Sequence, residues 1–359
     1  MLQYILRRIL YAIPVLLAIL VVTFALARMI PGDPCTAILG EKATQEACER
    51  FNQRFGLDKP ITTQLGLYML NIAKGDLGDS IRFGRPITLM LSERLPMTIE
   101  LGLTSMFLAV MIGIPAGLLS ALRRNSPTDL ITMIGANIGV SIPVFVLGLL
   151  LIYFFSVLLR DTAFALPPSG RLSPGVSSKP FYDVWEWGVT KESTGYLFLK
   201  FLSGFYIFNS IITLDFKVLG DALKHLIMPA FALSTIPLSI IARMTRSSLL
   251  EVLGQDFVRT AHAKGIQPRM VVVRHALRSA LLPVVTIIGL QSGAILGGAV
   301  LTETIFGLAG VGRSLFEAIT SRDFPVIQGF TIVITFIYVF VNLLVDVSYA
   351  FLDPRIRLE

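Results

Sequence analysis

The pattern of hydrophobic and polar positions is dominated by long runs that contain no charged residue. Five of these runs approach or exceed the roughly 20 residues needed to cross about 30 Å of hydrocarbon. They cover residues 9–27, 101–122, 130–159, 279–302 and 324–345. A sixth run, 226–242, is shorter, but Arg243 at its end can extend to the membrane interface. The pattern therefore predicts an all-α integral membrane protein with about six transmembrane helices.

A further apolar run, residues 201–214, is too short to be a span. Its length is typical of an interfacial, re-entrant or buried segment. If it were a seventh helix, every later loop would change sides, and the arginine-rich segment 243–278 would lie outside. The positive-inside rule disfavours that arrangement, so we reject it.

The basic residues fix the predicted orientation. Arg7 and Arg8 precede the first run and place the N-terminus inside; the first helix is expected to stay as an anchor because no convincing cleavage site follows it. Six spans then put Arg123 and Arg124, and the basic loop at about 244–278, on the inner side. Both termini are therefore expected in the cytoplasm.

Two long segments lie outside in this topology. The first follows the first span, so that residues 1–95 form an N-terminal unit ahead of a transmembrane domain at 96–352 and a tail at 353–359. It contains Cys35 and Cys48, the two cysteines of the chain. An oxidising exterior would let them form a disulfide, and two free thiols are the alternative. The second is a long insertion at about 160–225.

The inner loop has a helical pattern of its own. Residues 251–264 are predicted to form a helix, with Phe257 and Ala261 four residues apart on one face. Gly265 stands where a helix C-cap glycine is expected, and Pro268 can begin a second helix. A structured basic hairpin is typical of a docking surface for a cytosolic partner, and an anchor for anionic lipid headgroups is the alternative.

Composition agrees with a membrane protein and excludes several other classes. The chain is 54% hydrophobic and 15% charged, whereas soluble domains carry about 25% charged residues. Its net charge of +7 is concentrated in the short segments between apolar runs, which argues against nucleic acid as a partner. No HExxH motif or cysteine pair at metal spacing occurs, and we predict no catalytic residue, metal site or enzymatic activity.

One segment is close to a nucleotide-binding motif. Residues 307–314 match a phosphate-binding loop except that Arg313 replaces lysine, but the topology places them outside, where a tight glycine turn explains their spacing. Glu100, Glu303 and Asp346 lie near helix ends, where they can reach water, so we expect structural roles for them, with a functional role inside the membrane as the alternative.

Several motifs together identify a family. Residues 259–265 (RTAHAKG), 275–278 (HALR) and 281–286 (LLPVVT) resemble the inner-loop signature of ABC-transporter permeases for dipeptides and oligopeptides. Segments 243–248, 251–253, 31–34, 56–60 and 75–78 are similar to the same family, as are 301–306, 310–313, 322–325 and 353–357. The resemblance extends from Met1 to Arg357.

The resemblance implies the type I ABC importer permease fold, one half of a channel in a bacterial inner membrane. It implies a coupling helix that contacts an ATPase through Ala261, Gly265 and neighbouring residues. The predicted contact residues are Glu251, Asp256, Arg259, Thr260, Ala261, Ala263, Lys264, Gly265 and His275. The implied partners are a second related permease, two ATP-binding subunits that hold the ATP, an extracytoplasmic substrate-binding protein and a peptide substrate. Members of this family also import nickel, glutathione or sugars, and these small solutes are alternatives to peptide.

Two features depart from the general permease signature. The signature begins Glu-Ala-Ala, where this chain has Arg259, Thr260 and Ala261, and the Leu282–Pro283 pair falls later than expected; both features are shared by the peptide branch. The insertion at about 170–224, with Trp185 and Trp187, is long for that branch. It either contacts the binding protein or the pore mouth, or has no contact with substrate, and we favour the second reading.

The fifth run carries a face of small residues, which permits close packing or sliding of helices. From it we predict Gln291, Ser292, Gly293 and Gly297 as candidate pore-lining residues, with helix packing inside the subunit as the alternative. Two rivals remain: an ion-coupled secondary transporter, which needs ion sites at the bilayer midplane, and an intramembrane enzyme, which needs a catalytic pair at that depth. The apolar runs contain neither feature.

Overall fold

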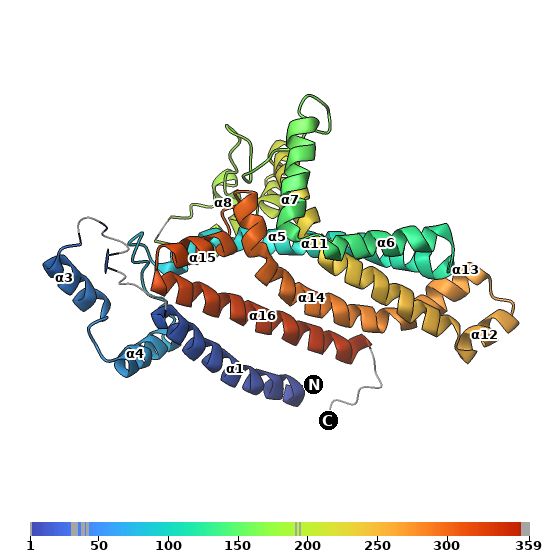
Figure 1. The fold of residues 1–359 in the computed structure, drawn as a ribbon, viewed down its shortest axis with the longest axis horizontal. Helices are drawn as coiled ribbons and strands as arrows, with labels where there is room; N and C mark the ends of the chain where they lie inside the picture. The colour runs from blue at the N-terminus through green and yellow to red at the C-terminus, as the bar shows by residue number, and fades with distance from the viewer. Residues whose placement is uncertain are drawn as a thin grey trace.

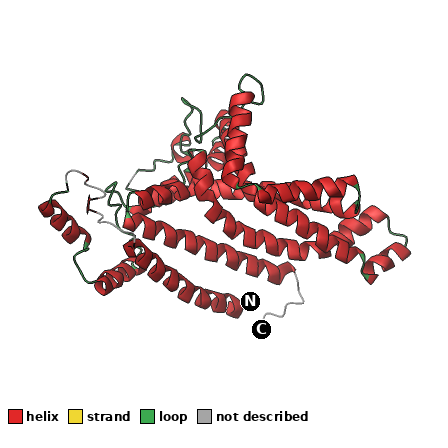
Figure 2. Cartoon of the chain, in the orientation of Figure 1, coloured by secondary structure: helices red, strands yellow, loops and turns green. Residues whose placement is uncertain are grey.

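The computed structural model describes residues 2–29, 35–36, 40, 43–190, 192–193 and 195–352. These residues form helices joined by loops, with no strand beyond an isolated bridge between Asp79 and Pro86 (Figure 2). The elements are α1 (Leu2–Met29), α3 (Gln45–Phe55), α4 (Ile61–Ala73), α5 (Ile87–Leu122), α6 (Pro127–Ser141), α7 (Val144–Ile152), the π-helix η2 (Tyr153–Leu158), α8 (Phe181–Val184), α9 (Tyr196–Ser203), α10 (Tyr206–Ile212), α11 (Phe216–Leu253), α12 (Asp256–Ala263), α13 (Pro268–Met270), the π-helix η3 (Val271–Ala276), α14 (Leu277–Ile305), α15 (Val311–Thr320) and α16 (Phe324–Leu352). The prediction of an all-α membrane protein is confirmed.

Four helical stretches are long and apolar enough to cross a membrane among the described residues: Ile87–Leu122, Phe216–Leu253, Pro268–Ile295 and Phe324–Val345. The bent pair formed by α6 and α7 is a fifth if it counts as one span. The predicted first span corresponds to α1, whose shorter apolar stretch is Leu10–Leu26. The total of about six is therefore reached only when the bent pair and α1 are both included.

The long helices lie roughly side by side along the long axis of the molecule (Figure 1). α11 is the central helix, because it packs against α5, α6, α7, α10 and α14. α1 packs on α16 at the edge of this bundle. The short helices α12 and α13 lie at one end of the molecule, and α3, α4 and α15 lie toward the other (Figure 1). We call these the inner and outer ends, following the predicted topology.

The predicted span at 130–159 is wrong as a single helix. The chain breaks at Ile142 and Pro143, and the axes of α6 and α7 meet at 102°. Proline lacks an N–H and disfavours helical torsions in the residue before it, and Ile142 has the extended torsions φ −81° and ψ 121°. In Figure 1, α7 stands nearly perpendicular to the bundle.

The apolar run at 201–214 forms no span, as predicted. Its residues belong to α9 and α10, two short helices separated at Gly204 and Phe205. They form part of the insertion, which is folded against the bundle: α9 packs on α5, and α10 packs on α11. Asn209 holds the loop before α8, since its side chain accepts a hydrogen bond from the Phe181 N–H (2.9 Å) and donates one to the Lys179 carbonyl (2.8 Å).

α5 and α11 approach each other closely at two glycines. A Cβ on Gly117 would lie 2.4 Å from the Ala242 carbonyl oxygen, and one on Gly113 would lie 3.0 Å from the Leu238 carbonyl oxygen. Glycines four residues apart form one flat helix face, on which a second backbone can pack. This contact fixes the two longest helices against each other.

In the outer segment, the structure joins Cys35 and Cys48 by a disulfide, with their Cα atoms 5.5 Å apart. Of the two alternatives that the sequence left open, the structure has the bridged one.

Candidate functional site

The inner end of the molecule is built by α11, α12, α13 and the π-helix η3. The predicted helix at 251–264 is interrupted, because α11 ends at Leu253 and α12 begins at Asp256. Gly254 and Gln255 form the connection, and Gln255 has extended torsions that start a new helix direction. Glu251 therefore belongs to the end of α11, and the predicted coupling helix is the eight-residue α12.

One face of α12 packs on the bundle. Val258 and Ala261 are buried in a cluster with Leu249 of α11 and with Val271 and Ala276 of η3. Phe257, which the sequence places four residues before Ala261 on one helix face, does not share the burial of Ala261. Because the helix begins at Asp256, its buried side is set by the spacing from Val258 to Ala261, and Phe257 is 41% exposed.

The turn after α12 agrees with the predicted pattern. Gly265 has φ +74°, a torsion that favours glycine, and its N–H donates to the His262 carbonyl. Pro268 is the first residue of α13, where its missing N–H leaves no bond unmade. The second helix of the hairpin then continues through η3 into α14.

Most of the predicted contact residues lie on the surface of this hairpin. Ala261 is buried on the packed face of α12, and His275 is half-buried. The other predicted residues are exposed: Glu251, Asp256, Arg259, Thr260, Ala263, Lys264 and Gly265. The Arg259–Asp256 ion pair (3.3 Å) is also fully on the surface. Contact between these residues and an ATPase stays a prediction.

The sequence argument missed an apolar component of this surface. Phe257, Met270 and Val273 are 41%, 46% and 53% exposed on the hairpin, among basic side chains. An apolar side chain at the water-facing end of a membrane protein is typical of a protein interface. The sequence did contain an indication of this surface. Phe257, Met270 and Val273 are apolar, but they do not continue the helical spacing of the buried residues Val258 and Ala261.

A partly buried ion pair beside the hairpin was also missed. Arg246 of α11 donates two hydrogen bonds to Asp129 of α6, at 2.8 and 2.9 Å, and Ser120 of α5 donates a third. The Asn125 N–H donates to the same carboxylate (3.0 Å). This network ties the α5–α6 loop, which carries Arg123 and Arg124, to the helix that leads into α12. Only the tertiary structure brings these side chains together.

The predicted pore-lining residues do not share one face of α14. A Cβ on Gly293 would lie 2.3 Å from the ring of Tyr338 in α16, so this glycine serves helix packing within the subunit. Gln291 and Ser292 are half-buried. Gly297 is exposed, and no atom lies within 4 Å of the Cβ position it lacks. Of the four, Gly297 alone presents an open face.

The glycine-rich segment 307–314 surrounds a carboxylate of this chain. The Arg313 N–H donates to Glu303 (2.9 Å), and the Thr98 hydroxyl donates to its other oxygen (2.6 Å). A Cβ on Gly310 would lie 2.3 Å from the Glu303 carboxyl carbon, so only glycine leaves room for this side chain. The expectation that Glu303 reaches water is wrong, because its side chain is fully buried.

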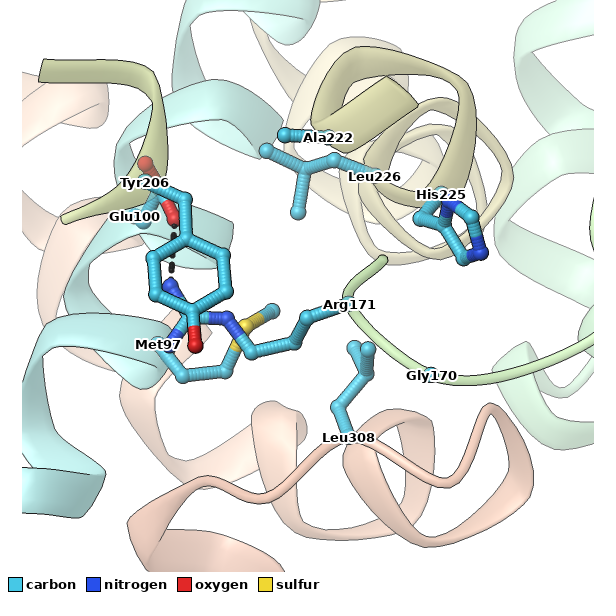
Figure 3. A pocket seen from close by; sticks show the side chains of 9 residues that line it. All are labelled: Met97, Glu100, Gly170, Arg171, Tyr206, Ala222, His225, Leu226 and Leu308. Atoms are coloured by element: carbon cyan, nitrogen blue, oxygen red, sulfur yellow. Dashed lines mark hydrogen bonds and ion pairs between the residues drawn. The ribbon is translucent and has the colours of Figure 1, made fainter. Parts of the chain in front are cut away.

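Glu100 is likewise buried rather than open to water. It forms an ion pair with Arg171 (2.9 Å) and accepts a hydrogen bond from the Ile207 N–H (2.7 Å). The Arg171 guanidinium also lies 3.6 Å from the centre of the Tyr206 ring and donates to the Gly204 carbonyl (2.8 Å). Figure 3 shows Arg171 beside the Tyr206 ring in this small pocket, with its ion pair to Glu100. The insertion is therefore fixed to the outer end of α5. The third acidic residue, Asp346, lies outside the described side chains, as do residues 353–359.

No group of three or more His, Cys, Asp or Glu side chains is placed to hold a metal ion among the described residues. The features that distinguish this structure are an apolar helical bundle, an ordered basic hairpin at the inner end and a folded insertion at the outer end.

Comparison with known proteins identifies the family. Residues 113–358 match the binding-protein-dependent transport system inner membrane component, and residues 1–102 match the N-terminal region of such membrane components. The dipeptide transport system permease protein DppB of Alkalihalophilus pseudofirmus is 44% identical, with 99% of this chain and 100% of that protein covered. The protein of the same name from Escherichia coli K12 is 42% identical over 99% of both chains, as is the di/tripeptide transport system permease protein DppB of Pseudomonas aeruginosa. The chain therefore belongs to the family of binding-protein-dependent transport system inner membrane components.

Proposed function

We propose that this chain is a permease subunit of an ATP-driven ABC importer and forms one half of a translocation channel for dipeptides and oligopeptides. Full-length similarity to dipeptide permeases supports the substrate class. The chain itself performs no hydrolysis in this proposal. ATP is bound by two cytoplasmic partner subunits, and an external binding protein delivers the peptide to this chain and a second, related permease.

The observation that carries the coupling role is the construction of α12. Val258 and Ala261 fix the helix to the inner end of the bundle, while Phe257, Arg259 and Thr260 remain exposed. A short helix held in this way transmits a push from a docked subunit to α11 and α14, because it shares a packed cluster with both. Closure of the ATPases then shifts a two-state channel between inward and outward access.

The proposed orientation places α12 and both termini in the cytoplasm of a bacterial cell, and the disulfide segment and the insertion outside the plasma membrane. Arg123, Arg124 and the basic hairpin then lie on the cytoplasmic side, as the positive-inside rule requires. The disulfide between Cys35 and Cys48 lies on the oxidising side.

Co-purification from native membranes tests the coupling role. The wild-type chain should carry ATPase subunits and a second permease, and Gly265→Val should lose the ATPase subunits because its φ of +74° strains a branched residue. Gly254→Ala is the matched control, since Gly254 ends α11 with an ordinary φ of −81°. Phe257→Lys changes the exposed surface without touching the turn and should also weaken ATPase capture.

The recovered complex then tests the substrate. In liposomes with ATP on the ATPase side, we expect uptake of a labelled dipeptide that depends on the binding protein. Uptake of nickel or glutathione in place of dipeptide would reassign the substrate. A chain that purifies alone and transports without ATP would contradict the importer itself and favour an ion-coupled secondary transporter.

A further inference from the structure

The break between α6 and α7 lies at membrane depth. α6 begins at Pro127, directly after the inner basic loop, and its 15 residues rise about 22 Å of the ~30 Å hydrocarbon layer. A Cβ on Gly139 would lie 2.9 Å from the Ser239 hydroxyl and 3.6 Å from the Thr235 carbonyl oxygen. Both of these residues lie in the central, apolar part of α11. The length of α6 and its contact with α11 thus both place the break inside the hydrocarbon layer.

The break leaves backbone carbonyls without hydrogen bonds. The last bond of α6 runs from the Ile142 N–H to the Ile138 carbonyl. Pro143 lacks the N–H that would donate to the Gly139 carbonyl. No described residue donates to the carbonyls of Val140 or Ser141. Lipid cannot satisfy such groups, so irregular backbone at this depth is tolerated only inside protein or along a water-filled cavity.

Polar side chains accompany these carbonyls on the same face. Asn137 and Ser141 are four residues apart and both are exposed. Ser141 donates to the Asn137 backbone carbonyl (2.8 Å), whereas the Asn137 side-chain amide has no partner among the described residues. Pro143, at the break itself, is exposed as well. The chain therefore does not cover this region, and its polarity is unsuited to lipid.

We propose that the α6–α7 break lines the aqueous path of the channel and binds the α-ammonium group of the transported peptide. The carbonyls of Gly139, Val140 and Ser141 and the Asn137 side-chain oxygen accept hydrogen bonds, and an ammonium group donates three. The end of α6 also carries the partial negative charge of a helix C-terminus, which favours a cation. This proposal rests on the proposed function, because it names the part of a peptide that the channel recognises.

Thiol labelling tests whether the break faces water. The chain has two cysteines, which are bonded to each other, so an introduced cysteine is the reactive thiol of this subunit. In the assembled importer in lipid nanodiscs, Ser141→Cys should react with a water-soluble methanethiosulfonate far faster than Ile131→Cys. Ile131 is 71% exposed on the same helix but points about a third of a turn away from the line of Asn137 and Ser141.

Labelling rates with charged reagents test whether the site favours a cation. After correction for reactivity with a free thiol, a cationic reagent should label Ser141→Cys about fivefold faster than an anionic one. In the absence of binding protein, excess dialanine should slow the cationic reagent, and N-acetyl-dialanine should not. Asn137→Leu in the same background should abolish protection by dialanine.

Three results would overturn the proposal. Labelling of Ser141→Cys no faster than that of Ile131→Cys would mean that the break is covered, for example by the second permease. Equal protection by N-acetyl-dialanine would exclude the ammonium group as the ligand, and equal protection by sodium chloride would replace it with an inorganic cation. Failure of the proposed function has a different signature, since the wild-type complex would then not take up dialanine with ATP whatever the labelling pattern.

Discussion

Glu303 illustrates how single residues in this chain act through buried contacts. Its carboxylate joins three elements, since Thr98 belongs to α5, Arg313 to α15 and Glu303 itself to α14. The Thr98 hydroxyl also accepts a hydrogen bond from the Val311 N–H (2.8 Å). The first turn of α15 therefore binds an anion, as helix N-termini commonly do, and the anion is a side chain of the same protein.

We expect Glu303→Ala to destabilise the protein by about 1.5–3 kcal/mol, because it leaves buried donors without an acceptor. Thermal unfolding of the purified chain in detergent should show a lowered Tm. Glu317→Ala is the control, since the Glu317–Arg313 ion pair is about 40% exposed at both partners and contributes little. Equal shifts for the two variants would contradict a special role for the buried carboxylate.

Among the elements, helix boundaries depend on local signals and helix contacts depend on the fold. Pro143 ends α6, Gly265 ends the α12 turn and Pro268 starts α13, each for reasons of backbone torsion or a missing N–H. Contacts between helices depend on the fold instead, because a glycine allows close approach only where the fold places a second helix beside it. Gly117 and Gly135 are both helical glycines at membrane depth, and only Gly117 has a backbone against it.

We therefore expect Gly117→Ala to separate α5 from α11 and to lower the Tm, because its Cβ would lie 2.4 Å from the Ala242 carbonyl oxygen. Gly135→Ala should leave the Tm unchanged or raise it slightly, since nothing lies within 4 Å and alanine favours the helix. The measurement is thermal unfolding of the two variants side by side. A lower Tm for Gly135→Ala than for Gly117→Ala would show that the α5–α11 contact is placed wrongly.

At the scale of the whole molecule, the two ends differ in chemistry. The inner end carries exposed basic side chains and the short helix α12, whereas the outer end carries the disulfide and the folded insertion with its buried ion pair. A broken helix at membrane depth also occurs in secondary transporters, where it binds coupling ions. Here the exposed polar side chains at the break, Asn137 and Ser141, are uncharged, and the comparison of dialanine with sodium chloride distinguishes an ammonium group from a coupling ion.

The proposed orientation predicts opposite labelling of the two ends. Lys264→Cys should react with a membrane-impermeant maleimide in inside-out vesicles and not in intact spheroplasts. Trp187→Cys, at a residue that is 58% exposed in the insertion, should show the reverse pattern. If both sites react from one side, the number of spans between residues 187 and 264 is even, and the apolar run 201–214, which forms α9 and α10, becomes the first segment to reassign.

The sequence by itself determined the membrane class, the position of most spans, the basic inner hairpin with its turn at Gly265, and the family. These properties follow from apolar length, from charge and from backbone preferences of single residues, all of which are local along the chain. Pro143 was also a visible signal for the break at 142–143, although uniform hydrophobicity on both sides concealed it.

Only the tertiary structure decided which polar residues are buried and which faces are open. The burial of Glu303 and Glu100, the ion pair between Arg246 and Asp129 and the packing of Gly293 on Tyr338 all join positions far apart in the sequence. In a chain with apolar residues on every side of its helices, hydrophobicity cannot distinguish a face that meets lipid from one that meets another helix. That choice is made by shape, through the few small residues that let particular helices approach.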